Sequence, residues 1–280
     1  MAAVWYRFRA ELRSRWRSVF ALALLAGIAG GATLAAIAGA RRTDSAFSRL
    51  RVDTNAIDVL VNPDFGSESK LDVRAVTKLP MVLQAGHERG VIAIPLPVRR
   101  FGDLDQAIGL ASDGKVAYSI GRPHVTAGRL PIATSVHEVL VNPRLATRHG
   151  LSVGDHYDAV ILGGDDFAAI EGSNLSFPQV LAAMNRGDYG TRVRLKVVGI
   201  GEFPDEIVVD EGFEQTATMV TPAFLHRYPQ ADAGYFGIAL RLRHGAADLA
   251  AFKKAVQALP HQGAIEFQTA PVTEAKVARA

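Results

Sequence analysis

The pattern of apolar and polar residues separates one long uncharged stretch near the N-terminus from a series of shorter segments behind it. Residues 18–40 contain no charged side chain, whereas Arg41 and Arg42 follow them directly and several arginines precede them. As a helix, this stretch is long enough to span the roughly 30 Å hydrocarbon core of a bilayer. A helix also satisfies its own backbone hydrogen bonds in lipid. The pattern therefore predicts a transmembrane helix over residues 18–40.

Small residues recur at every fourth position of this predicted membrane helix. They are Ala23, Gly27, Gly31, Ala35 and Gly39. Residues four apart share one face of a helix, and small side chains there allow a second helix to approach closely. We therefore predict that this face packs against helices of partner chains. The alternative is that these residues reflect only the general abundance of Ala and Gly in membrane helices.

A cleaved signal peptide is the competing interpretation of the same stretch. Ala38-Gly39-Ala40 fits a small-residue cleavage site, and the preceding arginines fit a charged leader region. The apolar run is longer than the usual 7–15 residues of a signal peptide, however, which favours an uncleaved anchor. In both cases we expect the bulk of the chain to lie on the far side of the membrane.

Residues 1–17 are predicted to form a short amphipathic helix on the cytoplasmic face, because apolar residues recur there at helical spacing between arginines. The alternative is a simple continuation of the membrane helix into the cytosol. Indole rings and arginine side chains are typical of the membrane–water interface. The residues expected at that interface are Trp5, Trp16, Arg17, Arg41 and Arg42. The arginine excess before the span favours a cytoplasmic N-terminus in a cell (plasma) membrane.

The rest of the chain alternates short strand and helix patterns, which predicts an α+β fold. Predicted strands cover residues 56–61, 90–98, 115–120, 138–141, 157–162, 192–200, 207–209, 216–220, 235–242 and 264–268. Predicted helices cover residues 71–84 (interrupted by Pro80), 144–149, 177–184, 222–227 and 246–259. The order of these elements suggests a β-rich lobe (122–212) inserted into an α/β lobe built from residues 45–121 and 213–270, with a tail at 271–280.

Composition narrows the function classes. The net charge is +3, but the first 20 residues alone carry +4, so the remaining chain is close to neutral. The basic character therefore belongs to the membrane-proximal segment and does not indicate nucleic-acid binding. The chain contains no cysteine, which excludes disulfides and thiolate chemistry.

No pattern in the sequence predicts catalysis, a cofactor or a metal site. Phosphate-loop and HExxH motifs are absent from the sequence. Two histidine pairings (His137 with Glu138, His149 with His156) lack the spacing of a metal site. The acidic pairs Asp165-Asp166 and Asp210-Glu211 are expected to be solvated loop charges.

Four groups of residues occur in a distinctive order along the chain. They are GARRTDSAF (39–47); AGRLP (127–131) with EVLVN (138–142) and GLSVGD (150–155); VVGI (197–200) running to PDEIVVD (204–210); and LRLRHGAADL (240–249). These motifs contain turns, helix caps and strand ends, and we expect Gly128, Gly150 and Gly154 to occupy tight turns or positive φ.

Taken together, the motifs resemble the first membrane helix and large extracytoplasmic domain of FtsX/MacB-type ABC transporter permeases, over nearly the whole chain. The resemblance implies a porter-like α/β lobe with an inserted β-rich lobe. It also implies that a separate cytoplasmic ATPase and further permease helices are partners, together with the lipid bilayer. Members of this family have at least three further membrane helices after the outer domain, so we expect a short subunit, half of a split permease or a fragment.

Three functions are therefore weighed from the sequence. The first is a permease subunit whose outer domain is coupled to an ATPase, for efflux or mechanotransmission. The second is a membrane-anchored binding or scaffold module without transport activity. The third, a secreted enzyme released by cleavage after Ala40, is disfavoured because no catalytic constellation is visible.

Overall fold

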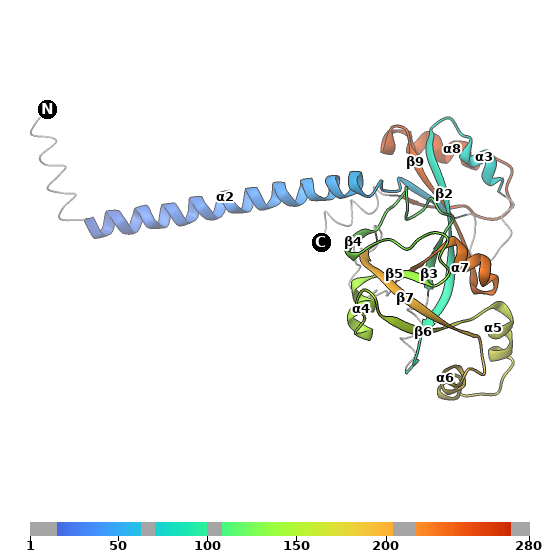
Figure 1. The fold of residues 1–280 in the computed structure, drawn as a ribbon. Coiled ribbons are helices and arrows are strands. Elements are labelled where there is room, and N and C mark those ends of the chain that lie inside the picture. The colour runs from blue at the N-terminus through green and yellow to red at the C-terminus, as the bar shows by residue number, and fades with distance from the viewer. Residues whose placement is uncertain (1–15, 63–70, 100–107, 204–216, 270–280) are drawn as a thin grey trace, which may run out of the picture. The chain divides into compact units, whose positions relative to one another are not determined.

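The computed structural model describes residues 16–62, 71–99, 108–203 and 217–269 (Figure 1). Contacts divide the chain into two compact units, Met1–Val52 and Asp53–Ala280, which are described separately below. Several predictions lie outside the described residues. They are most of the amphipathic helix 1–17 with Trp5, the strand 207–209, the pair Asp210-Glu211 and the tail 271–280.

The first unit is dominated by one long helix, α2 (Trp16–Asp53), which includes the whole of the predicted membrane segment. Large apolar side chains along it are exposed, among them Phe20, Leu25 and Leu34. The structure describes only some of the side chains in α2, and within that part no helix is long and apolar enough to cross a membrane. The membrane span over residues 18–40 thus stays a prediction.

The second unit is built on a mixed sheet. Its described residues contain ten strands: β1 (Val59–Asn62), β2 (Val82–Pro95), β3 (Ile108–Ser112), β4 (His124–Gly128), β5 (Glu138–Val141), β6 (His156–Ile161), β7 (Thr191–Glu202), β8 (Thr218–Val220), β9 (Asp232–Leu242) and β10 (Glu266–Thr269). The strand order is β10-β1-β9-β2-β3-β8-β5-β7-β4, with β6 paired to β2 and β7. The pairs β3–β8 and β5–β7 are parallel, and the other pairs along this path are antiparallel.

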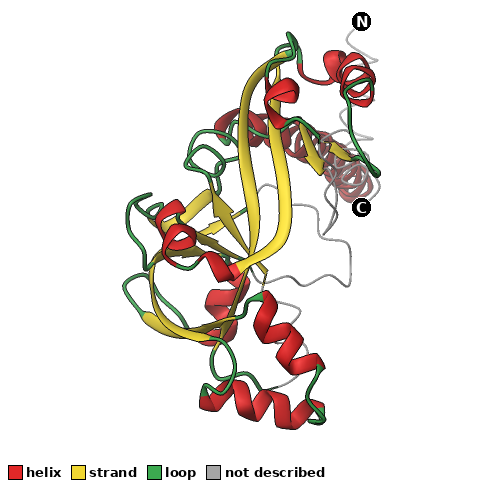
Figure 2. Cartoon of the chain, turned by 90° about the vertical axis from the view of Figure 1, so that its right-hand side faces the viewer, coloured by secondary structure: helices red, strands yellow, loops and turns green. Residues whose placement is uncertain are grey.

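Short helices accompany this sheet, as Figure 2 shows. They are α3 (Val73–Thr77), α4 (Pro143–His149), α5 (Gly164–Glu171), α6 (Phe177–Arg186), α7 (Pro222–Arg227) and α8 (Leu249–Gln257). The fold is therefore α+β, as the sequence predicted. The boundaries of the two predicted lobes, at residues 122 and 212, stay a prediction.

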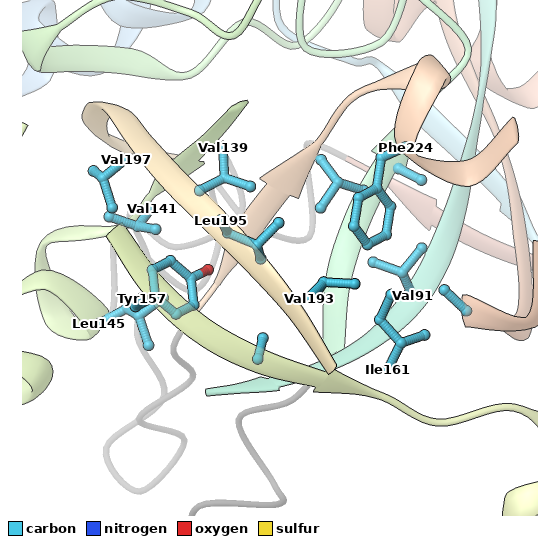
Figure 3. Close-up of a cluster of buried hydrophobic side chains, with 14 of the residues drawn as sticks. Val91, Val139, Val141, Leu145, Tyr157, Ile161, Val193, Leu195, Val197 and Phe224 are labelled. Carbon is cyan, nitrogen blue, oxygen red and sulfur yellow. The ribbon is translucent and has the colours of Figure 1, made fainter. Parts of the chain in front are cut away.

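Buried apolar side chains of the second unit form several clusters. One lies where β5, β6 and β7 meet α4 and α7, and includes Val139, Leu195 and Phe224, all fully buried (Figure 3). Another lies where α8 covers β1 and β9. Phe252 and Val256 of α8 are fully buried there, because residues four apart share one face of a helix.

Two predicted elements are wrong in part or whole. The helix predicted over 71–84, with an interruption at Pro80, is only the five-residue α3, and the part after Pro80 is wrong because β2 begins at Val82. The predicted strand over 115–120 is a turn with one isolated bridge, Val116 to Ile120. The Asp113 carboxylate shapes this turn by accepting the backbone N–H groups of Lys115 (2.8 Å) and Val116 (3.1 Å). In addition, the sequence patterns did not predict β3, β4 or α5.

Candidate functional site

Three of the motif stretches converge on one strand, β7. The Arg129 N–H donates to the Val198 carbonyl (2.9 Å), and the Gly154 N–H donates to the Val197 carbonyl (2.8 Å). The Lys196 N–H of β7 donates to the carbonyl of His137, next to β5. In addition, β4 and β5 both pair directly with β7. Residues 127–131, 138–142, 150–155 and 197–200 therefore form one structural cluster, which we call the β7 motif cluster.

Glycines in this cluster adopt the backbone conformations expected of them. Gly128, Gly150 and Gly154 have φ angles of 74°, 63° and 102°. Gly128 also lies against β7, where an added Cβ would come within 2.3 Å of the Val198 carbonyl oxygen. Only glycine fits both the left-handed conformation and that close approach.

Helix α4 begins and ends at signals that lie within the motifs. The Asn142 side chain accepts the Leu145 N–H (2.9 Å), and Pro143 occupies the first turn. Gly150 ends the helix in the left-handed conformation. These are the ordinary start and stop signals of a helix, which is why the sequence predicted α4 closely.

An ion pair closes the loop between β4 and β5. Both terminal nitrogens of Arg129 donate to the Glu138 carboxylate, at 2.8 and 2.6 Å, and the Ile132 N–H donates to the same group at 2.9 Å. The hydrogen bonds from Arg129 lower the pKa of Glu138 to about 2, although burial acts in the opposite direction. Burial, with a smaller effect from the Glu138 charge, raises the pKa of neighbouring Tyr118 to about 12. Glu138 is thus an ionised structural group.

The predicted helix-packing and interface residues belong to α2. Gly27, Gly31 and Gly39 have open space around them: apart from the adjacent backbone of α2 itself, no described atom lies within 4 Å of a Cβ added at any of the three. Ala35 and Arg17 are exposed. The backbone of Ala23, Trp16, Arg41 and Arg42 lies in α2, but their side chains are outside the description. The packing and interface roles stay predictions.

The expectation that Asp165 and Asp166 are solvated loop charges is wrong in part: both lie in α5 and not in a loop, and Asp166 is not a free solvated charge. Asp166 lies in the first turn of α5, where its carboxylate accepts the N–H of Gly163 (2.8 Å) and of Gly190 (2.9 Å). It therefore closes both ends of the α5–α6 segment, whereas Asp165 is exposed. An acidic residue three positions after a helix start is the sequence signal for this cap.

A cleft of about 300 Å³ lies between β2, the end of β3 and α7, and the sequence analysis missed it. His87 and Arg89 of β2 line one wall, Asp113 lies at the end of β3, and His226 comes from α7. The Asp113 carboxylate accepts the His87 N–H (2.8 Å) and lies 3.2 Å from His87 Nδ1. Burial raises the pKa of Asp113, but the backbone hydrogen bonds and the nearby histidine outweigh it, so that the pKa lies below its ordinary value.

Comparisons with known proteins gave structural neighbours alone. No protein-family model matches the chain, and no curated protein matches it. One similar solved structure is the extracellular domain of the noncanonic ABC-type transporter YknZ from Gram-positive bacteria, with a TM-score of 0.40 and 10% identity over 76% of this chain and 99% of that one. Another is the periplasmic region of MacB from Actinobacillus actinomycetemcomitans, with a TM-score of 0.41 and 8% identity over 80% of this chain and 94% of that one. Both neighbours are outer domains of ABC-type permeases, the class of protein that the sequence motifs resemble.

Proposed function

We propose that this chain is a permease-type subunit of an ABC transporter, with one membrane helix and an extracytoplasmic domain coupled to a separate cytoplasmic ATPase. The observation that carries the proposal is the β7 motif cluster. Stretches that were chosen from the sequence for their resemblance to such permeases meet around one strand, held mainly by backbone hydrogen bonds. They therefore behave as one structural signature rather than as unrelated short matches.

The apolar surface of α2 supports the membrane part of the proposal. Phe20, Leu24, Leu25, Ile28 and Leu34 are 54–70% exposed. Burying a large apolar side chain is worth about 1.5–3 kcal/mol, so a row of exposed ones favours insertion into lipid or contact with other helices. The small residues at Gly27, Gly31 and Gly39 would then offer the close-packing face for permease helices of partner chains.

The bonding of the carboxylates in the outer domain supports a coupling role rather than catalysis. Glu138, Asp113 and Asp166 each accept two or more hydrogen bonds from the loops and helix ends that they hold. A carboxylate whose acceptor sites are occupied in this way fixes backbone geometry and is poorly suited to exchange protons with a substrate. A domain fixed at these points can transmit a displacement without deforming at its turns.

The membrane topology can be tested cleanly because the chain has no cysteine. Asn174→Cys places one thiol at an exposed position between α5 and α6, and Ala2→Cys places one near the N-terminus. With a membrane-impermeant maleimide, we expect Asn174→Cys to be labelled in intact cells and Ala2→Cys to be labelled only after permeabilisation. Labelling of Asn174→Cys only after permeabilisation would contradict the proposed topology.

A further inference from the structure

We infer that the cleft between β2, β3 and α7 is a binding site for a small organic anion, namely a carboxylate with a short apolar body. This inference goes beyond the proposed permease role and does not depend on it. It rests on which hydrogen-bonding groups of the cleft are already used and which are not.

The acidic group of the cleft has little capacity left. One oxygen of Asp113 accepts the N–H groups of Lys115 and Val116, and the other accepts the His87 N–H and faces His87 Nδ1 at 3.2 Å. A carboxylate offers about four lone-pair sites, so all of them have a partner. A cationic ligand would find no available carboxylate oxygen here.

Donor groups, by contrast, remain available. Arg89 uses Nη1 to pair with Asp232 at 2.6 Å, and a guanidinium group has five N–H donors in all. Its side chain is 49% exposed, so the remaining donors can reach a ligand. His226 in the last turn of α7 is exposed, and its side chain makes no hydrogen bond to any other described residue.

The His87 ring is held at Asp113, whose carboxylate lies 3.2 Å from its Nδ1. The other ring nitrogen, Nε2, is buried and has no hydrogen-bond partner in the described part of the chain. The Phe236 ring holds both basic side chains. It stacks with the His87 ring at 5.7 Å, and the Arg89 guanidinium lies 5.5 Å from its centre. The cleft therefore offers more donors than acceptors, which favours an anion.

The remaining walls select the kind of anion. Ala111, Pro222 and Leu225 give the cleft an apolar side. A volume of about 300 Å³ is at the lower end for small-molecule pockets, which limits the apolar body to a few carbon atoms or one ring. The planar fork of Arg89 matches the geometry of a carboxylate.

The test is isothermal titration of the full chain in detergent micelles with benzoate, and with benzamide as its neutral isostere. We expect saturable benzoate binding in the millimolar range or tighter, and benzamide binding at least fivefold weaker. Arg89→Gln and His226→Gln should each weaken benzoate binding at least fivefold. Arg186→Gln is the matched control, because Arg186 also pairs with a carboxylate (Asp188, 2.6 Å) but lies away from the cleft, and it should leave binding unchanged.

Several results would overturn the inference. They are the absence of saturable benzoate binding, equal binding of benzamide, or unchanged binding by both cleft variants. Thermal unfolding of each variant shows whether it is folded. If Arg89→Gln does not fold, the exposed His226→Gln and the benzamide comparison still decide the matter. No ATPase takes part in this measurement, so its failure would leave the permease proposal standing.

Discussion

Replacing Glu138 by Gln removes the charge from the ion pair that closes the β4–β5 loop while keeping the shape of the side chain. The Glu138 side chain is only 15% exposed, whereas Arg129 is 50% exposed. At about 1.36 kcal/mol per pKa unit, a fall from the ordinary 4.5 to about 2 sets an upper limit of about 3 kcal/mol. Because solvent at Arg129 screens the pair, we expect a loss of about 1–2 kcal/mol in the free energy of unfolding.

The contribution of Glu138 to the free energy of unfolding should change with pH in one direction. Because the folded-state pKa of Glu138 is lowered, its contribution is fully present above pH 4.5 and is lost as the pH falls towards 2. Urea unfolding of the full chain in detergent, followed by circular dichroism, should show a large difference between wild type and Glu138→Gln at pH 7. That difference should shrink steadily below pH 4.5.

The control for this experiment is Asp188→Asn, which breaks an ion pair of similar length whose two side chains are 61% and 50% exposed. It should not change the urea midpoint measurably. If Glu138→Gln unfolds at the wild-type midpoint at pH 7, or if its difference from wild type is the same at pH 3 as at pH 7, the reasoning about Glu138 is refuted.

Three further predictions follow from single contacts. Gly128→Ala should lower the free energy of unfolding by more than about 2 kcal/mol, because the added Cβ would meet a β7 carbonyl at 2.3 Å. Gly150→Ala, where the added Cβ has open space, should lower it by only about 1 kcal/mol. Urea unfolding that gives the two variants equal stability would contradict this. Asp166→Ala should speed amide hydrogen exchange of Gly190 at least tenfold, because its carboxylate partner is removed; unchanged exchange would argue against that role. Burial raises the pKa of Tyr157 to about 12, so its stabilising contribution should be lost as the pH rises from 10 to 12. Tyr157→Phe should therefore lose less stability than wild type over that range, which urea unfolding at alkaline pH would measure.

The elements that could be predicted from the sequence are those with local signals. Helix α4 has its cap at Asn142, a proline in its first turn and Gly150 at its end, and the prediction came within one residue. Strand β5 and helix α7 also matched, because each is bounded by a turn or cap residue. Such signals work because they act on backbone groups within a few residues of themselves.

The elements that could not be predicted depend on distant or non-repetitive contacts. Val116, Tyr118 and Ile120 alternate like a strand, yet the Asp113 carboxylate bonds the neighbouring backbone N–H groups and makes the segment a turn. The cleft escaped prediction because β2, β3 and α7 are far apart in sequence. Only the pairing of β2 with β3, and the packing of α7 beside them, brings His87 and His226 to one place.

Association with an ATPase is the most direct test of the permease proposal. A photo-cross-linking amino acid in place of Trp5, in the segment predicted to be cytoplasmic, should capture an ATPase subunit in native membranes, to be identified by mass spectrometry. The same cross-linker in place of Asn174, in the outer domain, should not capture it. Suppose that maleimide labelling confirms the proposed topology but no ATPase is captured at Trp5. The permease proposal is then contradicted, and the membrane-anchored binding module becomes the better account.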